Sequence, residues 1–191
     1  MKLRACLARA TALAVLISLA AVPAAAANPM EALRDAVAAR LLLMDDVARF
    51  KWNAKLPITD PQREATLLER STASAVALGL PEDYARRVLA AQIEASRTIQ
   101  AALFDRWREA NQGELGDVPD LATVQRPAID RATATFLEAL AAAQCDLADP
   151  DAKALLERPS AVADQARAWA IATAPLLTTS PCPHPPSPTG R

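Results

Sequence analysis

A run of residues that recur every three or four positions between 30 and 51 constrains this chain more than any other feature. The spacing is typical of a helix that packs along one face. The eleven-residue step from Arg40 to Lys51 equals three helical turns plus about 20°, so these two cations share that face. The face consists of Met30, Leu33, Val37, Arg40, Met44, Val47 and Lys51. The chain is therefore expected to place two cations within a packed helical seam.

These two cations need an explanation, because burying an unpaired charge is strongly unfavourable. The common solution is an internal ion pair with Asp or Glu of another helix, or a long side chain that reaches solvent. The alternative is an anionic ligand that binds between the helices. The pair taken alone favours the common solution, so the rest of the chain has to decide.

The remaining composition favours helices throughout. The chain has 191 residues, enough for one domain, with only 4 glycines and 4% aromatic residues, and it shows no alternating strand pattern. We therefore predict an all-α, single-domain bundle of about six helices without a β-sheet, over residues 28–177. The expected helices are 29 to 52 or 54, 60–78, 81–108, 126–145, 150–158 and 160–174, with a loop at 110–121.

Capping signals set several of these boundaries. Asn28 and Pro29 begin the first helix, and Thr59 or Asp60 caps the second. Gly79 followed by Pro81 ends the second helix and begins the third. Ser160 is expected to cap the last helix, which should end before Pro175 because proline interrupts the helical hydrogen-bond ladder.

The N-terminal segment 1–27 has the pattern of a cleavable signal peptide. Lys2, Arg4 and Arg9 precede an apolar stretch at 10–22, and small residues favour cleavage near Ala27. The apolar stretch is short for a membrane anchor, so we expect a periplasmic or secreted protein without stable membrane association. The formal charge of −1 would become about −4 after cleavage, and such an acidic protein is a poor nucleic-acid binder.

Two cysteines remain after that cleavage, Cys145 and Cys182. In an exported protein they most simply form one disulfide, which would tether the proline-rich tail 178–191. The single histidine, His184, lies in this tail and is expected to be solvated and non-functional. One histidine and two cysteines leave no plausible zinc or haem site.

Several further polar residues fall on apolar helix faces or at helix starts. Ser96 and Gln100 lie one turn apart in the third helix, where a simple hydrogen-bonded pair would be the ordinary explanation. Together the set suits a small dianion that carries a hydroxyl group, and no activated nucleophile or triad for hydrolysis accompanies it. The candidate site residues are Arg40, Lys51, Asp60, Arg63, Glu64, Ser96, Gln100 and Arg126.

At these residues the chain resembles the all-α chorismate mutases, most closely their secreted, periplasmic-type subclass. The family spacing is an Arg, a Lys 11 residues later, an Asp after 9 more, then Arg and Glu, and Arg40, Lys51, Asp60, Arg63 and Glu64 match it. The family's Ser/Thr and Gln/Glu pair one turn apart matches Ser96 and Gln100. Arg126 fits the secreted subclass, although one residue more than expected separates it from Pro119-Asp120-Leu121. The signal peptide and the late disulfide are also similar to that subclass.

The resemblance implies conversion of chorismate to prephenate without cofactor or metal. Arg40 and Arg126 would hold carboxylates, supported by Arg63 and Ser96. Lys51 and Gln100 would donate to the ether oxygen, and Glu64, with Asp60 ordering the helix start, would hold the ring hydroxyl. Two other hypotheses stay open: a lyase of the same fold that releases pyruvate from isochorismate, and a non-enzymatic helical binding or chaperone module. A homodimer is expected from the resemblance alone.

Overall fold

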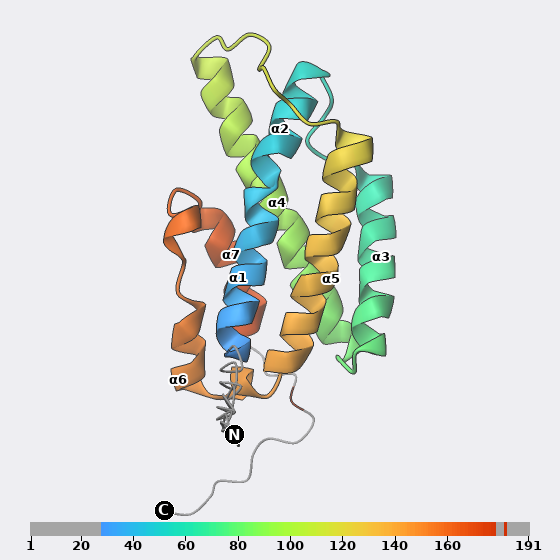
Figure 1. Cartoon of the computed structure of the whole chain (residues 1–191), viewed down its shortest axis with the longest axis vertical. Coiled ribbons are helices and arrows are strands. Elements are labelled where there is room, and N and C mark those ends of the chain that lie inside the picture. Colours follow the sequence, from blue (N-terminus) through green and yellow to red (C-terminus); the bar gives the residue numbers. More distant parts are fainter. Residues whose placement is uncertain (1–27, 179–181, 183–191) are drawn as a thin grey trace, which may run out of the picture.

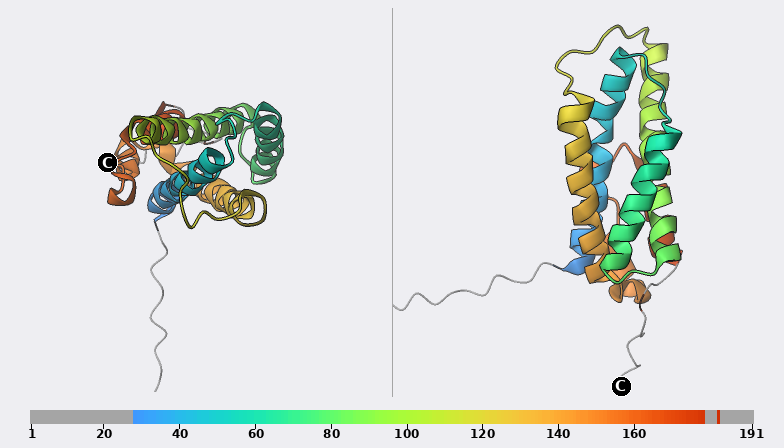
Figure 2. Two further views of the ribbon diagram at one scale, coloured as in Figure 1. Left: turned by 90° about the horizontal axis from the view of Figure 1, so that it is seen from above. Right: turned by 90° about the vertical axis from the view of Figure 1, so that its right-hand side faces the viewer.

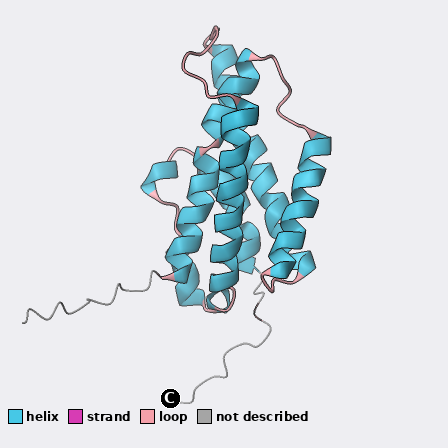
Figure 3. Cartoon of the chain, turned by 45° about the vertical axis from the view of Figure 1, so that its right-hand side comes forward, coloured by secondary structure: helices cyan, strands magenta, loops and turns pink. Residues whose placement is uncertain are grey.

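The computed structural model describes residues 28–178 and Cys182. These residues form helices and loops without a strand (Figure 3), as predicted. The α-helices are α1 Pro29–Leu42, α2 Met44–Asn53, α3 Pro61–Ala77, α4 Glu82–Glu109, α5 Arg126–Ala143, α6 Pro150–Lys153 and α7 Ala166–Thr178. The all-α fold class is confirmed. With α1 and α2 counted as one helix, the described residues contain the six helices expected.

The helix predicted from residue 29 onward is interrupted at Leu43, the residue between α1 and α2. Leu43 keeps helical backbone angles, with φ −66° and ψ −18°, so α2 continues the direction of α1 (Figure 1). The predicted seam is present: Met30, Leu33 and Val37 are buried, and Arg40 is only 4% exposed. The structure therefore does place a cation inside the helical core.

The long helix α4 organises the bundle. It packs against α7 on one side and against α2 and α3 on the other, while α1 packs along α5. Seen from above, α1 and α5 lie together across from α4 (Figure 2). Buried side chains of these helices, including Leu41, Val88 and Phe136, fill the space between them. This arrangement places the last turns of α1 and α2, the middle of α4 and the first turn of α5 close to the start of α3.

The caps of α3 agree with the sequence signals. The side chain of Asp60 accepts a hydrogen bond of 3.2 Å from the backbone N–H of Arg63, and Pro61 occupies the first turn. Gly79 has φ +88° at the end of the helix, a left-handed conformation that favours glycine. Asp60 is therefore the cap, and Thr59 precedes it.

The C-terminal helix differs from its prediction at both ends. Residues Ser160–Val162 form a separate 3-10 turn, so α7 begins at Ala166 and Ser160 does not cap it. The helix also continues through Pro175 to Thr178. Proline removes one hydrogen bond of the last turns, but Ala172 and Leu176 are fully buried. Packing against α4 therefore outweighs the lost bond.

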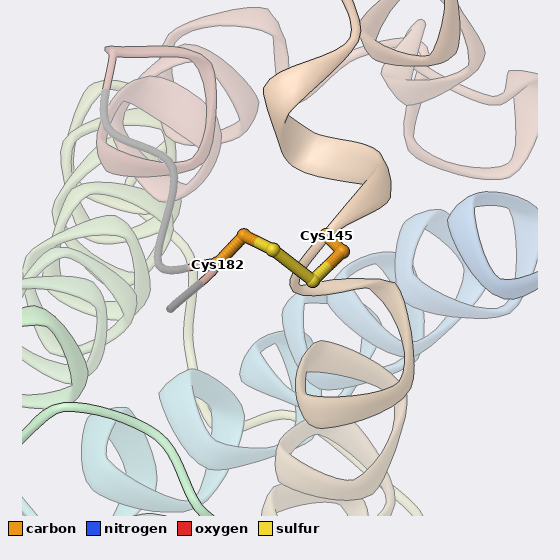
Figure 4. The surroundings of a disulfide bond; sticks show 2 residues. All are labelled: Cys145 and Cys182. Carbon is orange, nitrogen blue, oxygen red and sulfur yellow. A yellow bond between two sulfur atoms is a disulfide. The ribbon is translucent and has the colours of Figure 1, made fainter. Parts of the chain in front are cut away.

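Cys145 and Cys182 form the predicted disulfide, with Cα atoms 4.6 Å apart and a sequence separation of 37 (Figure 4). Cys145 follows the end of α5, so the bond joins the chain beyond α7 to that end of the bundle. The proposed signal peptide 1–27 and His184 lie outside the described residues. Among the helices that are described, none combines the length and the apolar character that a membrane crossing requires.

Candidate active site

A cavity of about 420 Å³ lies between α1, α2, α3, α4 and α5. Its volume is in the usual range for small-molecule sites. All eight residues predicted from the sequence line it: Arg40, Lys51, Asp60, Arg63, Glu64, Ser96, Gln100 and Arg126. Apolar side chains such as Val47, Ile93 and Leu121 form the rest of the wall. The fold thus brings together polar groups from five helices.

Arg40 lies at the buried end of this cavity. Its Nε atom donates to Oε1 of Gln92 at 3.3 Å, and Nη1 donates to the hydroxyl of Thr133. The guanidinium also lies 5.9 Å from the centre of the Phe136 ring. Burial lowers the pKa of Arg40 from its usual value to about 10, which leaves it charged at neutral pH.

Lys51 is half-buried and comes from the last turn of α2. Its ammonium group donates to the carbonyl oxygen of Ile58 at 2.6 Å, which ties the loop before α3 to α2. Burial lowers the pKa of Lys51, and the carboxylates of Glu64 and Asp60 partly oppose this shift. One of three N–H donors is therefore used internally, and two can face a ligand.

Glu64 is fixed at the start of α3 by two contacts. Oε1 accepts from the backbone N–H of Asp60 at 3.2 Å, and both carboxylate oxygens accept from the guanidinium of Arg97 on α4. The hydrogen bond from Arg97 holds the pKa of Glu64 below its usual value. Arg97 lines the cavity too, and it was not predicted, because residue spacing gave no sign of its distant partner.

Ser96 and Gln100 lie one turn apart on α4, as predicted. The Ser96 hydroxyl donates to the carbonyl of Gln92 at 2.8 Å, and Nε2 of Gln100 donates to the carbonyl of Ser96 at 3.1 Å. The other neighbour of Nε2 is the sulfur of Met44 at 4.0 Å, a weak acceptor. Gln100 is 4% exposed, and its Oε1 has no hydrogen-bond partner among the described residues.

Arg126 reaches the cavity from the first turn of α5. A π-helical turn, Leu121–Gln125, directly precedes it, and such turns accommodate one extra residue in a helix. This turn accounts for the additional residue found in the sequence before Arg126. The Nε atom of Arg126 is buried without a hydrogen-bond partner in the described chain.

Charge pairing distinguishes the cavity from an ordinary protein interior. Within the described residues, Arg97 pairs with Glu64, but no ion pair involves Arg40, Lys51, Arg63 or Arg126. Four cations around one cavity repel each other unless an anion binds between them.

The described residues contain no group of three or more His, Cys, Asp or Glu side chains that could bind a metal ion.

Two supporting residues were also missed at the sequence level, Gln92 and Thr133. Gln92 precedes Ser96 by four residues and Gln100 by eight, so it lies on the same face of α4. Thr133 is the buried polar residue of the α5 core face that includes Phe136. In both cases a polar residue stands at a position where the helical pattern expects an apolar one. This pattern could have identified Gln92 and Thr133 as buried polar residues.

The fold and the cavity define an all-helical protein with a cationic pocket for a small anion. Residues 31–101 match the family described as Chorismate mutase type II. The chain is 34% identical over 158 residues to "Secreted chorismate mutase" of Mycobacterium tuberculosis, covering 80% of this chain and 79% of that protein. It therefore belongs to the chorismate mutase type II family.

Solved structures agree with this assignment. The chain resembles the crystal structure of chorismate mutase from Burkholderia thailandensis with a TM-score of 0.68 and 38% identity, over 78% of this chain and 98% of that one. It also resembles secreted chorismate mutase from Yersinia pestis with a TM-score of 0.59, over 78% and 94% of the two chains. The identity of 23% in the second case supports the fold alone.

Proposed function

We propose that the cavity converts chorismate to prephenate by an intramolecular [3,3] rearrangement. The observation that carries this proposal is a cavity of about 420 Å³ lined by four cations that form no ion pair with any described residue. Chorismate is a dianion with a ring hydroxyl and an ether oxygen, so its two carboxylates are opposite in sign to the cations that line the cavity. The family membership and the names of the relatives support the same reaction.

The arginines bind and orient the substrate. Arg40 and Arg126 hold its two carboxylates, and Arg63 supports them together with the hydroxyl of Ser96. The guanidinium geometry allows two parallel hydrogen bonds to a carboxylate, which fixes its direction as well as its position. Holding both carboxylates favours the folded conformer in which the two reacting carbons approach each other.

Lys51 and Gln100 stabilise the transition state. As the C–O bond of the ether breaks and the new C–C bond forms, negative charge develops on the ether oxygen. The two remaining N–H donors of Lys51 are available to that oxygen. One N–H of Gln100 is used by the Ser96 carbonyl, and the other, which contacts the weak acceptor Sδ of Met44 at 4.0 Å, would turn to the ether oxygen. Donors that are already oriented stabilise this charge more in the transition state than in the bound substrate.

Glu64 holds the ring hydroxyl, and Asp60 orders the helix start that presents it. The ion pair with Arg97 keeps Glu64 charged and therefore able to accept a hydrogen bond. None of these roles transfers a proton or forms a bond to the protein, and no cofactor or metal takes part.

The protein also acts outside the cytoplasm, in our proposal. Its N-terminal 27 residues have the signal-peptide pattern, and the relative from Mycobacterium tuberculosis is named a secreted enzyme. All eight candidate residues of the cavity come from one chain, so each subunit of the expected homodimer has its own site.

The decisive experiment adds chorismate to the purified protein and measures prephenate. Formation of prephenate supports the mutase. Release of pyruvate from isochorismate without activity on chorismate would instead select the lyase, and inactivity toward both substrates would favour a non-enzymatic module. Arg40→Met provides the matched inactive variant, because methionine fills similar space without the charge.

A further inference from the structure

Among the described residues, Arg40 has only neutral hydrogen-bond partners. Its guanidinium donates to the amide oxygen of Gln92 and the hydroxyl of Thr133, and it faces the ring of Phe136. A buried arginine is usually stabilised by a carboxylate. The carboxylate of Asp130 attracts Arg40 through space, but these two residues form no ion pair.

Gln92 is the centre of this arrangement. It is 1% exposed, among the most buried polar side chains of the described chain. Its Nε2 atom donates to the carbonyl oxygen of Ala172 on α7 at 3.1 Å, while Oε1 accepts from Arg40. The side chain thus connects α7 to the cavity residue Arg40 through α4.

The two contacts fix the orientation of the Gln92 amide. The Ala172 carbonyl can only accept a hydrogen bond, and the guanidinium of Arg40 can only donate. A flipped amide would place its NH₂ group against the guanidinium and its oxygen against the carbonyl, which would break both bonds. The α7 backbone therefore forces the Gln92 oxygen to face Arg40.

Thr133 is oriented by the same principle. Its hydroxyl donates to the carbonyl of Ile129 at 2.7 Å, so only its lone pairs are left for Nη1 of Arg40. Both partners of Arg40 are thereby locked as acceptors by backbone carbonyls of their own or a neighbouring helix. This leaves the guanidinium well oriented with its full charge.

We propose that Gln92 is a positioning residue for Arg40, which holds the guanidinium through an uncharged oxygen so that its positive charge stays available to a substrate carboxylate. This inference rests on the proposed function, because it assigns the anion bound by Arg40 to chorismate. A glutamate at position 92 would still accept a hydrogen bond from Arg40, but it would lose the bond to the Ala172 carbonyl. Its negative charge would also neutralise Arg40 and compete with the substrate. A glutamine keeps the geometry and leaves the charge unpaired.

The test compares three variants of the purified protein. Gln92→Glu adds a charge while preserving the shape of the side chain. Gln92→Met keeps its volume and removes both hydrogen bonds. Thr173→Val is the control, because it removes a buried hydroxyl that donates to the Trp169 carbonyl within α7 and has no contact with Arg40 or Gln92 among the hydrogen bonds of the described residues. For each, the melting temperature, kcat and KM for chorismate are measured, and the affinity for prephenate is measured by calorimetry.

Gln92→Glu should raise KM and weaken prephenate binding by about tenfold, because the internal carboxylate pairs with Arg40, while kcat falls less than threefold. Gln92→Met should lower kcat and raise KM together, since Arg40 is no longer held. Thr173→Val should leave both constants unchanged. A purely structural role for Gln92 would change the melting temperature without the selective rise in KM.

The inference is wrong if the wild-type protein is active, the Gln92→Glu variant folds, and the KM of that variant is less than threefold above the wild-type KM. Where Gln92→Glu does not fold, Gln92→Met with wild-type kcat and KM would overturn it instead. Failure of the wild-type protein to convert chorismate is a different outcome, which would contradict the proposed function itself.

Discussion

The role of Lys51 gives the most demanding test of the proposed mechanism. Lys51→Ala removes an ammonium group at the wall of the cavity. One N–H of this group donates to the Ile58 carbonyl at 2.6 Å, and the other two are available to a ligand. Arg40, Arg63 and Arg126 remain to bind the carboxylates. The change should therefore remove a contact to the reacting oxygen and leave most of the substrate binding in place.

The expected magnitude follows from the type of contact. Lys51 is half-buried, and no ion pair within the described residues satisfies it. Removing one oriented donor from a developing oxyanion costs about 3–4 kcal/mol, so kcat should fall by about 10²- to 10³-fold. Lys51→Arg should recover little of this loss, because a planar guanidinium does not reproduce a point-like ammonium donor.

The pH dependence of the wild-type enzyme tests the same residue. No proton is transferred in the reaction, so the rate should be constant across neutral pH. Burial lowers the pKa of Lys51 below that of an ordinary lysine. Activity should therefore be present while Lys51 is protonated and decline on the alkaline side, beginning at a lower pH than an exposed lysine would give. Lys51→Ala should lose the part of this decline that Lys51 causes, while the part due to Arg40, whose pKa is about 10, remains.

The assay measures initial rates of chorismate consumption over a range of concentrations and pH values. Lys153→Ala is a matched control, because Lys153 also donates to a backbone carbonyl, that of Leu177 at 2.9 Å, but it does not line the cavity. Its kcat should equal that of the wild type. A kcat for Lys51→Ala within threefold of the wild type, with native helix content, would refute the placement of the ether oxygen beside Lys51.

Three further predictions concern other parts of the chain. Gln100→Glu should be impaired at neutral and alkaline pH and recover as the pH falls, because only a protonated carboxyl can donate a hydrogen bond to the ether oxygen. Burial and the bound dianion raise the pKa of the introduced carboxyl. A pH profile of kcat/KM that runs parallel to that of the wild type would contradict this prediction. Arg97→Met should raise the pKa of Glu64, because the hydrogen bond from Arg97 is the main cause of its lowered pKa. As the pH falls, kcat/KM of the variant should therefore begin to decline at a higher pH than kcat/KM of the wild type. Identical declines of the two proteins at acid pH would show that the charge of Glu64 does not depend on Arg97. Reduction of the disulfide should lower the free energy of unfolding by at most about 4 kcal/mol and the melting temperature by roughly 8–16 °C. Activity in the cold should survive, because the bond lies at the end of α5 opposite Arg126. Two titratable thiols in the native protein would exclude the bond.

Some residues of the candidate site could be predicted from the sequence, and others could not. Lys51, Asp60 and Glu64 lie within 13 residues of each other, and their positions follow from helix periodicity and from a cap. The Arg97 partner of Glu64 lies 33 residues further along the chain. No local pattern relates two such residues, so their contact depends on how α3 packs against α4.

Local interactions explain most of what the sequence by itself determined: the helical class, the caps of α1 and α3, and the face shared by Arg40 and Lys51. The pairing of the two remaining cysteines is not local, and it followed from their number alone. Hydrogen bonds and side-chain neighbours four residues apart act before the chain is packed, so they can be read from spacing. Tertiary packing alone decided that α7 continues through Pro175, because the burial of that helix against α4 outweighs a local signal to stop. It also decided that the partners of Arg40 are neutral, since Gln92 and Thr133 lie 52 and 93 residues away and meet it only when three helices assemble.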